Sequence, residues 1–268
     1  MPELPEIASR AAQMTELLAG KVIQEITVLQ PKCLNIPAAE FQASLCGAKL
    51  GKTTCRGKWL FTETDLGRLL LNLGMGGELL LVKPDRLPEK RRLVFHFTDG
   101  EALSVNFWWF GYAHFTRPDE LHRHEMTARL GPNALDVSME DLAAAAKTQR
   151  TRVKSYLLDQ SKIAGIGNAY IHDILFQARL HPLTPLITLT PDQISGLHAA
   201  IRKGLTTSLE KGGAFYEVDL LGRPGGFTMD DILIGYKEGK PCPVCSTPIT
   251  KIKTGATSSY ICPHCQPL

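Results

Sequence analysis

The chain has 268 residues, of which 44% are hydrophobic and 21% charged, and its formal net charge is +3 at pH 7. This is the composition of an ordinary globular protein with room for one large domain or two smaller ones. This small net charge is compatible with nucleic-acid binding but is no evidence for it, because the evidence would be a cluster of cationic residues. No apolar run is long enough to span a bilayer, and the acidic N-terminus lacks the apolar segment of a secretory signal.

The chain begins Met-Pro-Glu-Leu-Pro-Glu, which allows two interpretations. Removal of Met1 would leave Pro2 with a free secondary amine, and an α-amino group with a pKa of about 8 is roughly one-tenth neutral nucleophile at pH 7. Such an amine can form an iminium with an electrophilic carbon, and Glu3 and Glu6 would lie within reach to move protons. The alternative is a plain helix start, with Pro5 at a first helical position and an acidic first turn.

Short β-type runs follow a first helix, which the apolar pattern predicts over residues 5–18. Turn signals such as Asp99-Gly100 separate the runs. The predicted strands are 22–28, 49–54, 58–63, 68–73, 78–82, 92–97 and 103–107. So many short strands in succession predict a β-sandwich.

Helical patterns take over after residues 130–133, a Leu-Gly-Pro-Asn break that we interpret as a hinge between domains. Ser138 can cap a helix, with Asp141 three residues on. A Thr-Pro-Asp-Gln start predicts a longer helix from residue 190 to about residue 211. Together with the strands, these helices indicate an α+β protein.

Four of the seven cysteines form two C-x-x-C pairs, Cys242 with Cys245 and Cys262 with Cys265. This spacing can place four thiolates around one Zn²⁺, and four cysteines leave no open coordination position, so we expect a structural zinc. The apolar-flanked arms 247–253 and 258–261 would form the hairpin between the pairs. A redox pair or a disulfide framework is the alternative. We interpret the other three cysteines as buried small hydrophobes, which fits a reducing compartment.

Two further motifs are weak when taken alone. Residues 162–168 form a glycine-containing turn before a helix, which could expose backbone amides to a phosphate or could be a plain helix connection. Residues 56–59, Arg-Gly-Lys-Trp, place two cations before an aromatic and could equally be a solvated strand end.

Taken in order along the chain, these motifs resemble the formamidopyrimidine-DNA glycosylase / endonuclease VIII family of base-excision repair enzymes. The segments that carry the resemblance are 2–6, 56–58, 73–77, 130–132, 163–170, 236–245 and 262–265. The resemblance implies an N-terminal β-sandwich domain over 1–130, a helix–two-turns–helix domain over 131–235 and a C-terminal zinc-finger hairpin over 236–268. It also implies DNA bound across the cleft between the halves.

Catalytic roles follow from the resemblance. Pro2 would attack C1′ of the damaged nucleotide, Glu3 would handle protons at the sugar and base, and Glu6 would support the geometry. Lys58 matches the family's β-hairpin lysine, which contacts DNA near the lesion.

The resemblance also implies DNA contacts. Met75 matches the residue that fills the space left by the flipped base. An enzyme of this kind needs such a residue because chemistry on a stacked base requires that the base be extruded from the helix. Asn168 matches an asparagine that grips a phosphate beside the lesion, and Lys154 matches a phosphate-binding lysine. Lys251 and Lys253 are the cations of the finger hairpin.

Two departures from the family pattern bear on the substrate. Where the formamidopyrimidine branch has Asp-Pro-Arg-Arg-Phe-Gly, residues 106–111 read Asn-Phe-Trp-Trp-Phe-Gly, so that Trp108, Trp109 and Phe110 form an aromatic turn. Aromatics favour stacking on bases over hydrogen-bond readout, unless the tryptophans pack in the sandwich core. The arginine usual in the finger hairpin is Thr257 here.

We therefore expect a DNA glycosylase with abasic-site lyase activity that acts on damaged DNA and holds one structural Zn²⁺. The alternative is a DNA-binding relative that recognises abasic or distorted sites with little base excision. A zinc-ribbon regulator fits less well, because it would not need Pro2. We expect a monomer in a reducing, cytoplasmic compartment, associated with the nucleoid and with no membrane partner.

Overall fold

In the computed structural model, which describes residues 1–108 and 110–268, the chain forms two units. One comprises Met1–Arg129 and Lys211–Gly226, and the other Leu130–Glu210 and Phe227–Leu268. The first boundary falls at the Leu-Gly-Pro break. No helix within the described ranges is both long and apolar enough to cross a membrane.

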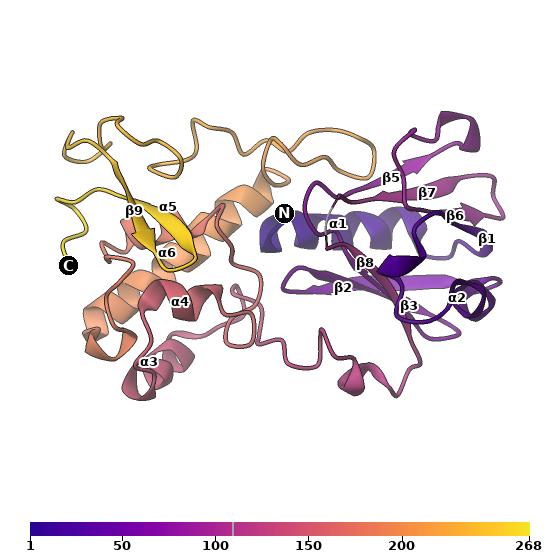
Figure 1. Cartoon of the computed structure of the whole chain (residues 1–268), viewed down its shortest axis with the longest axis horizontal. Helices are drawn as coiled ribbons and strands as arrows, with labels where there is room; N and C mark the ends of the chain where they lie inside the picture. The colour runs from indigo at the N-terminus through magenta and orange to yellow at the C-terminus, as the bar shows by residue number, and fades with distance from the viewer. Residues whose placement is uncertain (109) are drawn as a thin grey trace. The chain divides into compact units, whose positions relative to one another are not determined.

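Helix α1 (Leu4–Leu18) opens the first unit and buries one of its faces. Glu3 caps the helix in a reciprocal capping box with Glu6, which satisfies backbone amides of the first turn that have no partner within the helix. The hydroxyl of Thr15 donates to Thr53 O and accepts from Thr53 N, at 3.0 and 2.9 Å, and so fixes α1 to the neighbouring strand β2 (Leu50–Arg56). Figure 1 shows α1 running beside the strands.

Two four-stranded antiparallel sheets complete the first unit, which is the predicted sandwich. In one sheet the order is β2, β3 (Trp59–Thr64), β4 (Arg68–Asn72), β8 (Tyr112–Thr116). In the other it is β1 (Ile23–Val28), β6 (Leu93–Phe97), β7 (Ala102–Asn106), β5 (Glu78–Val82). Leucine, isoleucine and phenylalanine side chains from both sheets and from α1 form one buried core.

The sandwich also contains elements that the sequence pattern did not predict. Helix α2 (Ala38–Leu45) buries Phe41 and Leu45 against the core, and β8 was not predicted as a separate strand. Short 3-10 turns lie at Pro31–Cys33, Pro84–Arg86 and Leu121–Arg123, and in the second unit at Leu186–Thr188.

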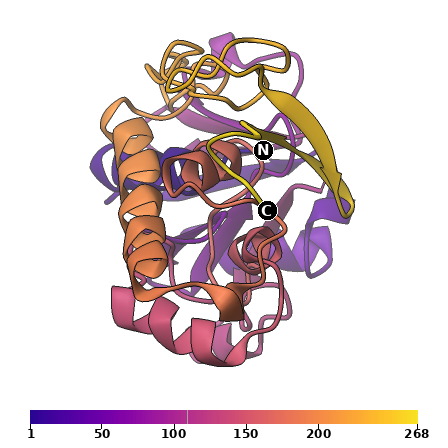
Figure 2. The same cartoon turned by 90° about the vertical axis from the view of Figure 1, so that its left-hand side faces the viewer.

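Helices are the main regular elements of the second unit. They are α3 (Met139–Thr148), α4 (Val153–Leu158), α5 (Ile171–Gln177) and α6 (Pro191–Glu210). The predicted cap of α3 is present, because the Asp141 backbone N–H donates to the Ser138 hydroxyl at 3.0 Å. In Figure 2 the long orange α6 lies beside α5, and the magenta α3 lies across the lower end of α6.

A two-stranded hairpin, β9 (Thr250–Thr254) and β10 (Thr257–Ile261), ends the second unit and confirms the predicted finger. A small core joins it to the helices, with Phe176 of α5, Ile234 and Ile249 packed around two of the cysteines. The hairpin therefore rests on a cluster far smaller than the sandwich core.

Candidate functional site

The N-terminus of α1 places two buried carboxylates next to Pro2. Pro2 is itself buried, and Glu3 and Glu6 are 3% and 2% exposed. Glu6 Oε2 accepts from Glu3 N at 2.8 Å and Glu6 Oε1 accepts from Ala214 N at 3.0 Å. Because each Glu6 oxygen receives a backbone N–H, this side chain fixes geometry. The predicted helix start is therefore present, and the residues that form it are the same two carboxylates for which we predict proton transfer.

A third carboxylate and a buried arginine join this cluster. Glu217 Oε1 lies 3.8 Å from the N-terminal nitrogen of Met1, and the Glu217 side chain is 8% exposed. Arg10, 2% exposed, interacts electrostatically with Glu217, Glu6 and Asp219. Sequence reasoning missed Glu217 and Arg10. Arg10 could have been found from its spacing of one helical turn after Glu6, but no local pattern marks Glu217, since only the fold brings it to α1.

Lys58 lies in the tight turn that joins β2 to β3. Gly57 has φ of +58° at the first central position of this turn, which suits glycine because it has no Cβ. The Asn72 side-chain amide donates to Lys58 O at 3.0 Å and fixes the turn from β4. The lysine ammonium is therefore presented on a short, braced hairpin.

Met75, Trp108 and Phe110 form an exposed apolar tip on the first unit. They are 51%, 63% and 71% exposed, so Trp108 does not pack in the sandwich core; Trp109 lies outside the described residues. Trp108 N donates to Met75 O at 3.0 Å, and a Cβ added at Gly76 would meet the indole of Trp108 at 3.2 Å. The indole therefore lies over Gly76, which leaves it room.

Lys154 is the buried cation of the second unit, at 3% exposure. Its ammonium donates to Thr254 Oγ1 and Thr257 Oγ1 at 3.0 Å each and to Ser258 O at 2.8 Å. Burial lowers the pKa of Lys154 to about 8. The three hydrogen bonds use all three ammonium protons, so a phosphate would have to replace one of the hairpin acceptors. The structure thus brings Lys154 to Thr257, the position where the family pattern has an arginine.

The other predicted phosphate contacts are on the surface. Asn168, Lys251 and Lys253 are exposed, and the ammonium of Lys251 lies 5.8 Å from the centre of the Tyr260 ring. The Tyr236 hydroxyl donates to Asn168 O at 3.2 Å, which ties the glycine-containing turn to the start of the finger segment. These side chains can reach a ligand without rearrangement of the core.

Cys242, Cys245, Cys262 and Cys265 bring their Sγ atoms within 4.8 Å of one another. Three of the Sγ–Sγ distances are 3.4, 3.5 and 3.9 Å, close to the roughly 3.8 Å expected for thiolates about 2.3 Å from one tetrahedral zinc. Backbone N–H groups of Val244 and Cys265 also point at Sγ atoms, at 3.4 Å each, where they would stabilise thiolates. The donor set fits one structural Zn²⁺, which would hold the hairpin to the small core.

Family models match the chain in three successive segments. The formamidopyrimidine-DNA glycosylase N-terminal domain matches residues 1–106, the helix–two-turns–helix domain of the same enzymes matches 130–218, and the zinc finger found in these enzymes and in isoleucyl-tRNA synthetase matches 239–268.

Full-length relatives agree with these matches. The chain is 32% identical over 274 residues to the formamidopyrimidine-DNA glycosylase of Symbiobacterium thermophilum, which covers 100% of this chain and 90% of the relative. It is 35% identical to that of Chloroflexus aurantiacus, covering 99% and 98%. A solved structure of the Lactococcus lactis enzyme in complex with abasic-site DNA matches with a TM-score of 0.91 and 26% identity, over 99% of this chain and 100% of that one. The chain belongs to the formamidopyrimidine-DNA glycosylase family.

Proposed function

We propose that Pro2, freed by removal of Met1, is the nucleophile through which this DNA glycosylase with abasic-site lyase activity attacks C1′ of a damaged nucleotide. Membership of the family over the full length carries the activity itself. The identity of the nucleophile is supported by one observation above the others: Pro2 is buried at the start of α1 beside Glu3 and Glu6.

The chemistry needs an amine held in place and groups that move protons around it. The secondary amine adds to C1′, the bond to the base breaks, and loss of the remaining N–H proton with opening of the sugar ring gives an iminium. Glu6 holds two backbone amides, so we assign it to positioning, and Glu3 to proton transfer at the sugar and base.

The DNA partner is proposed from chemistry on both units. On the first unit, Lys58 would contact the backbone near the lesion, and Met75 and Trp108 offer an apolar surface for the space that a flipped base leaves. On the second unit, Asn168 and the two hairpin lysines are exposed toward solvent and suit phosphate binding. We further propose that the protein acts as a monomer in a cytoplasmic, reducing compartment, where four thiolates can hold zinc.

Borohydride trapping on an abasic-site oligonucleotide tests the nucleophile, because it reduces the iminium to a stable covalent adduct. We expect rapid trapping by the processed protein and none by a variant with an uncleavable N-terminal extension, which converts the amine into an amide. Zinc content and DNA affinity of the extended protein are the controls for folding. Trapping of the extended protein at the wild-type rate would instead make a lysine such as Lys58 the nucleophile.

A further inference from the structure

The segment that follows α6 returns to α1 and carries Glu217 to the N-terminal amine. Glu217 Oε1 and the Met1 nitrogen are 3.8 Å apart, and both groups belong to the first unit. The Met1 nitrogen is separated from the Pro2 nitrogen by only the Cα and carbonyl carbons of Met1. Glu217 therefore borders the space that Met1 leaves on removal, which is the space that C1′ must enter to reach Pro2.

Backbone contacts fix this segment on both sides of Glu217. On one side, Ala214 N donates to Glu6, and Glu217 N donates to Ala214 O at 3.0 Å. Gly213 has φ of +96°, and a Cβ there would lie 2.9 Å from Glu6 Cγ, so the approach to Glu6 requires a glycine. On the other side, Gly225 N donates to Glu217 O at 3.0 Å.

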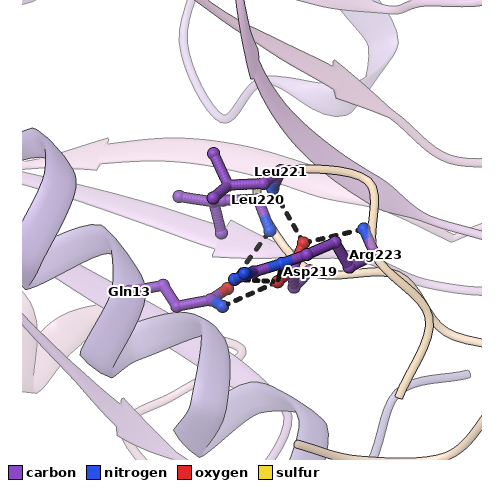
Figure 3. A network of polar contacts seen from close by, with 5 residues as sticks. All are labelled: Gln13, Asp219, Leu220, Leu221 and Arg223. Atoms are coloured by element: carbon purple, nitrogen blue, oxygen red, sulfur yellow. Dashed lines mark hydrogen bonds and ion pairs between the residues drawn. The ribbon is translucent and has the colours of Figure 1, made fainter.

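Asp219, two residues after Glu217, holds the loop in place through hydrogen bonds (Figure 3). Its carboxylate accepts from Arg223 Nε at 2.8 Å and from Gln13 Nε2 of α1 at 3.1 Å, and Gln13 Oε1 accepts from Leu220 N at 3.1 Å. Leu220 O accepts from Leu81 N of β5 at 2.8 Å. The loop is thus anchored to both α1 and the sheet, so the position of Glu217 is part of the fold.

The charges around Glu217 suit reversible proton transfer. The N-terminal amine and Arg10 face it as cations, and Glu3 and Glu6 face it as carboxylates. In the chain that still carries Met1, burial is the main cause that raises the pKa of Glu217 to about 7; the Met1 amine and Arg10 oppose this rise, and the neighbouring carboxylates add to it. A carboxyl group that titrates near the working pH is suited to act as a general base.

We infer that Glu217 is a further catalytic residue of this enzyme: it accepts a proton from the Pro2 ammonium and so frees the nitrogen lone pair that attacks C1′. The inference rests on the proposed role of Pro2. In this step one N–H bond of the ammonium breaks and one O–H bond of the Glu217 carboxyl forms, and no other reactant is needed. The three carboxylates then have separate roles: Glu217 deprotonates Pro2, Glu6 is held by backbone amides and positions the site, and Glu3 transfers protons at the sugar and base.

The test is single-turnover borohydride trapping on abasic-site DNA between pH 6 and pH 9 for Glu217→Gln, which keeps the shape of the side chain and removes its basicity. Without Glu217 the Pro2 ammonium must lose its proton to solvent, so the acid limb should move toward the ordinary α-amino pKa of about 8. We expect trapping to slow about tenfold or more at pH 6.5–7 and the difference to shrink by pH 9, with DNA affinity within about twofold.

Two further variants serve as controls. Glu16→Gln removes an exposed carboxylate from the same helix α1 and should leave the rate unchanged. Glu217→Asp keeps the carboxylate and should recover part of the rate with the wild-type acid limb, which also covers the case in which the glutamine variant does not fold.

A wild-type rate and pH profile for Glu217→Gln would overturn the inference, and so would an equal loss at every pH accompanied by weaker DNA binding, which would mark a structural role. Failure of the Pro2 assignment is a separate result, because it appears as trapping by the N-terminally extended protein whatever residue occupies position 217.

Discussion

Two regions differ from the family pattern in different ways, each at a position where that pattern has an arginine. At the tip of the first unit, Trp108 replaces the cation with an exposed indole that lies over Gly76. At the finger hairpin, Thr257 replaces the cation with a hydroxyl that accepts from the buried Lys154 ammonium. The tip has therefore exchanged a charge for a stacking surface, whereas the hairpin keeps a positive charge nearby on a different residue. We therefore expect the difference at the tip to affect which bases are recognised, and the difference at the hairpin to affect how tightly the DNA backbone is bound.

We expect the largest effect from loss of the zinc site, which should unfold only the hairpin. Cys262→Ser, or removal of zinc by a chelator, should unfold the finger and lower DNA affinity by about a hundredfold or more, because such a small hairpin depends on its metal for folding. Trp59 and Trp108 lie in the first unit, so their fluorescence should stay nearly constant. Metal analysis should give about one zinc per chain. Metal-free protein with an ordered finger would contradict this prediction.

The next effect separates the two roles open to Lys154. Lys154→Met removes an ammonium that makes three hydrogen bonds to the hairpin, which we expect to destabilise the hairpin by about 1–3 kcal/mol. Protection of the hairpin amides in hydrogen exchange measures that loss. If Lys154 acts through the hairpin, Thr257→Arg in the same background should recover part of the DNA affinity, since an arginine supplies a bidentate phosphate fork. Unchanged hairpin protection with a loss of affinity would favour direct phosphate contact instead.

Substitution of Trp108 tests the tip. Base–aromatic stacking contributes about 1–3 kcal/mol and is tolerant of sequence, so Trp108→Ala should weaken binding to lesion DNA by that amount with any base opposite the lesion. Excision of one lesion opposite each of the four bases should differ by less than about tenfold in the wild type, because stacking reads no base edge. Trp108→Arg should introduce a preference for cytosine. A strong wild-type preference for 8-oxoguanine opposite cytosine, lost in Trp108→Ala, would show that stacking is the wrong reading of this substitution.

The smallest effect concerns the exposed hairpin lysines. Lys251→Ala or Lys253→Ala should weaken binding only modestly but should lower the slope of log affinity against log salt by about one, since each phosphate contact releases a counterion. Lys147→Ala, a change of an exposed lysine on α3, is the control and should leave the slope unchanged. An affinity that does not vary between low and moderate salt would contradict phosphate anchoring.

The sequence could predict those features that a local pattern marks. Local patterns with a strong physical cause were sufficient for the sandwich, for the capped α3 and for the four cysteines, since periodicity, capping and metal-ligand spacing are all written within a few residues. The short helix α2 was not predicted, because only two of its residues are buried and its sequence shows no long apolar stripe.

Long-range pairings explain most of what the sequence did not show. Glu217 reaches α1 through a loop more than two hundred residues away, and Lys154 meets Thr257 across 103 residues. Neither pair has a local signature. Arg10 is an intermediate case, since its helical spacing from Glu6 was visible but its electrostatic interactions with Glu217 and Asp219 were not.

Peptide mapping of the borohydride-trapped complex identifies the nucleophile directly and so tests the assignment of Pro2. After digestion of the protein and the DNA, mass spectrometry locates the residue that carries the reduced sugar remnant. We predict that the remnant is attached to an N-terminal peptide that begins at Pro2, with fragment ions placing the added mass on the proline. A remnant on the peptide that contains Lys58, with the N-terminal peptide unmodified, would contradict it.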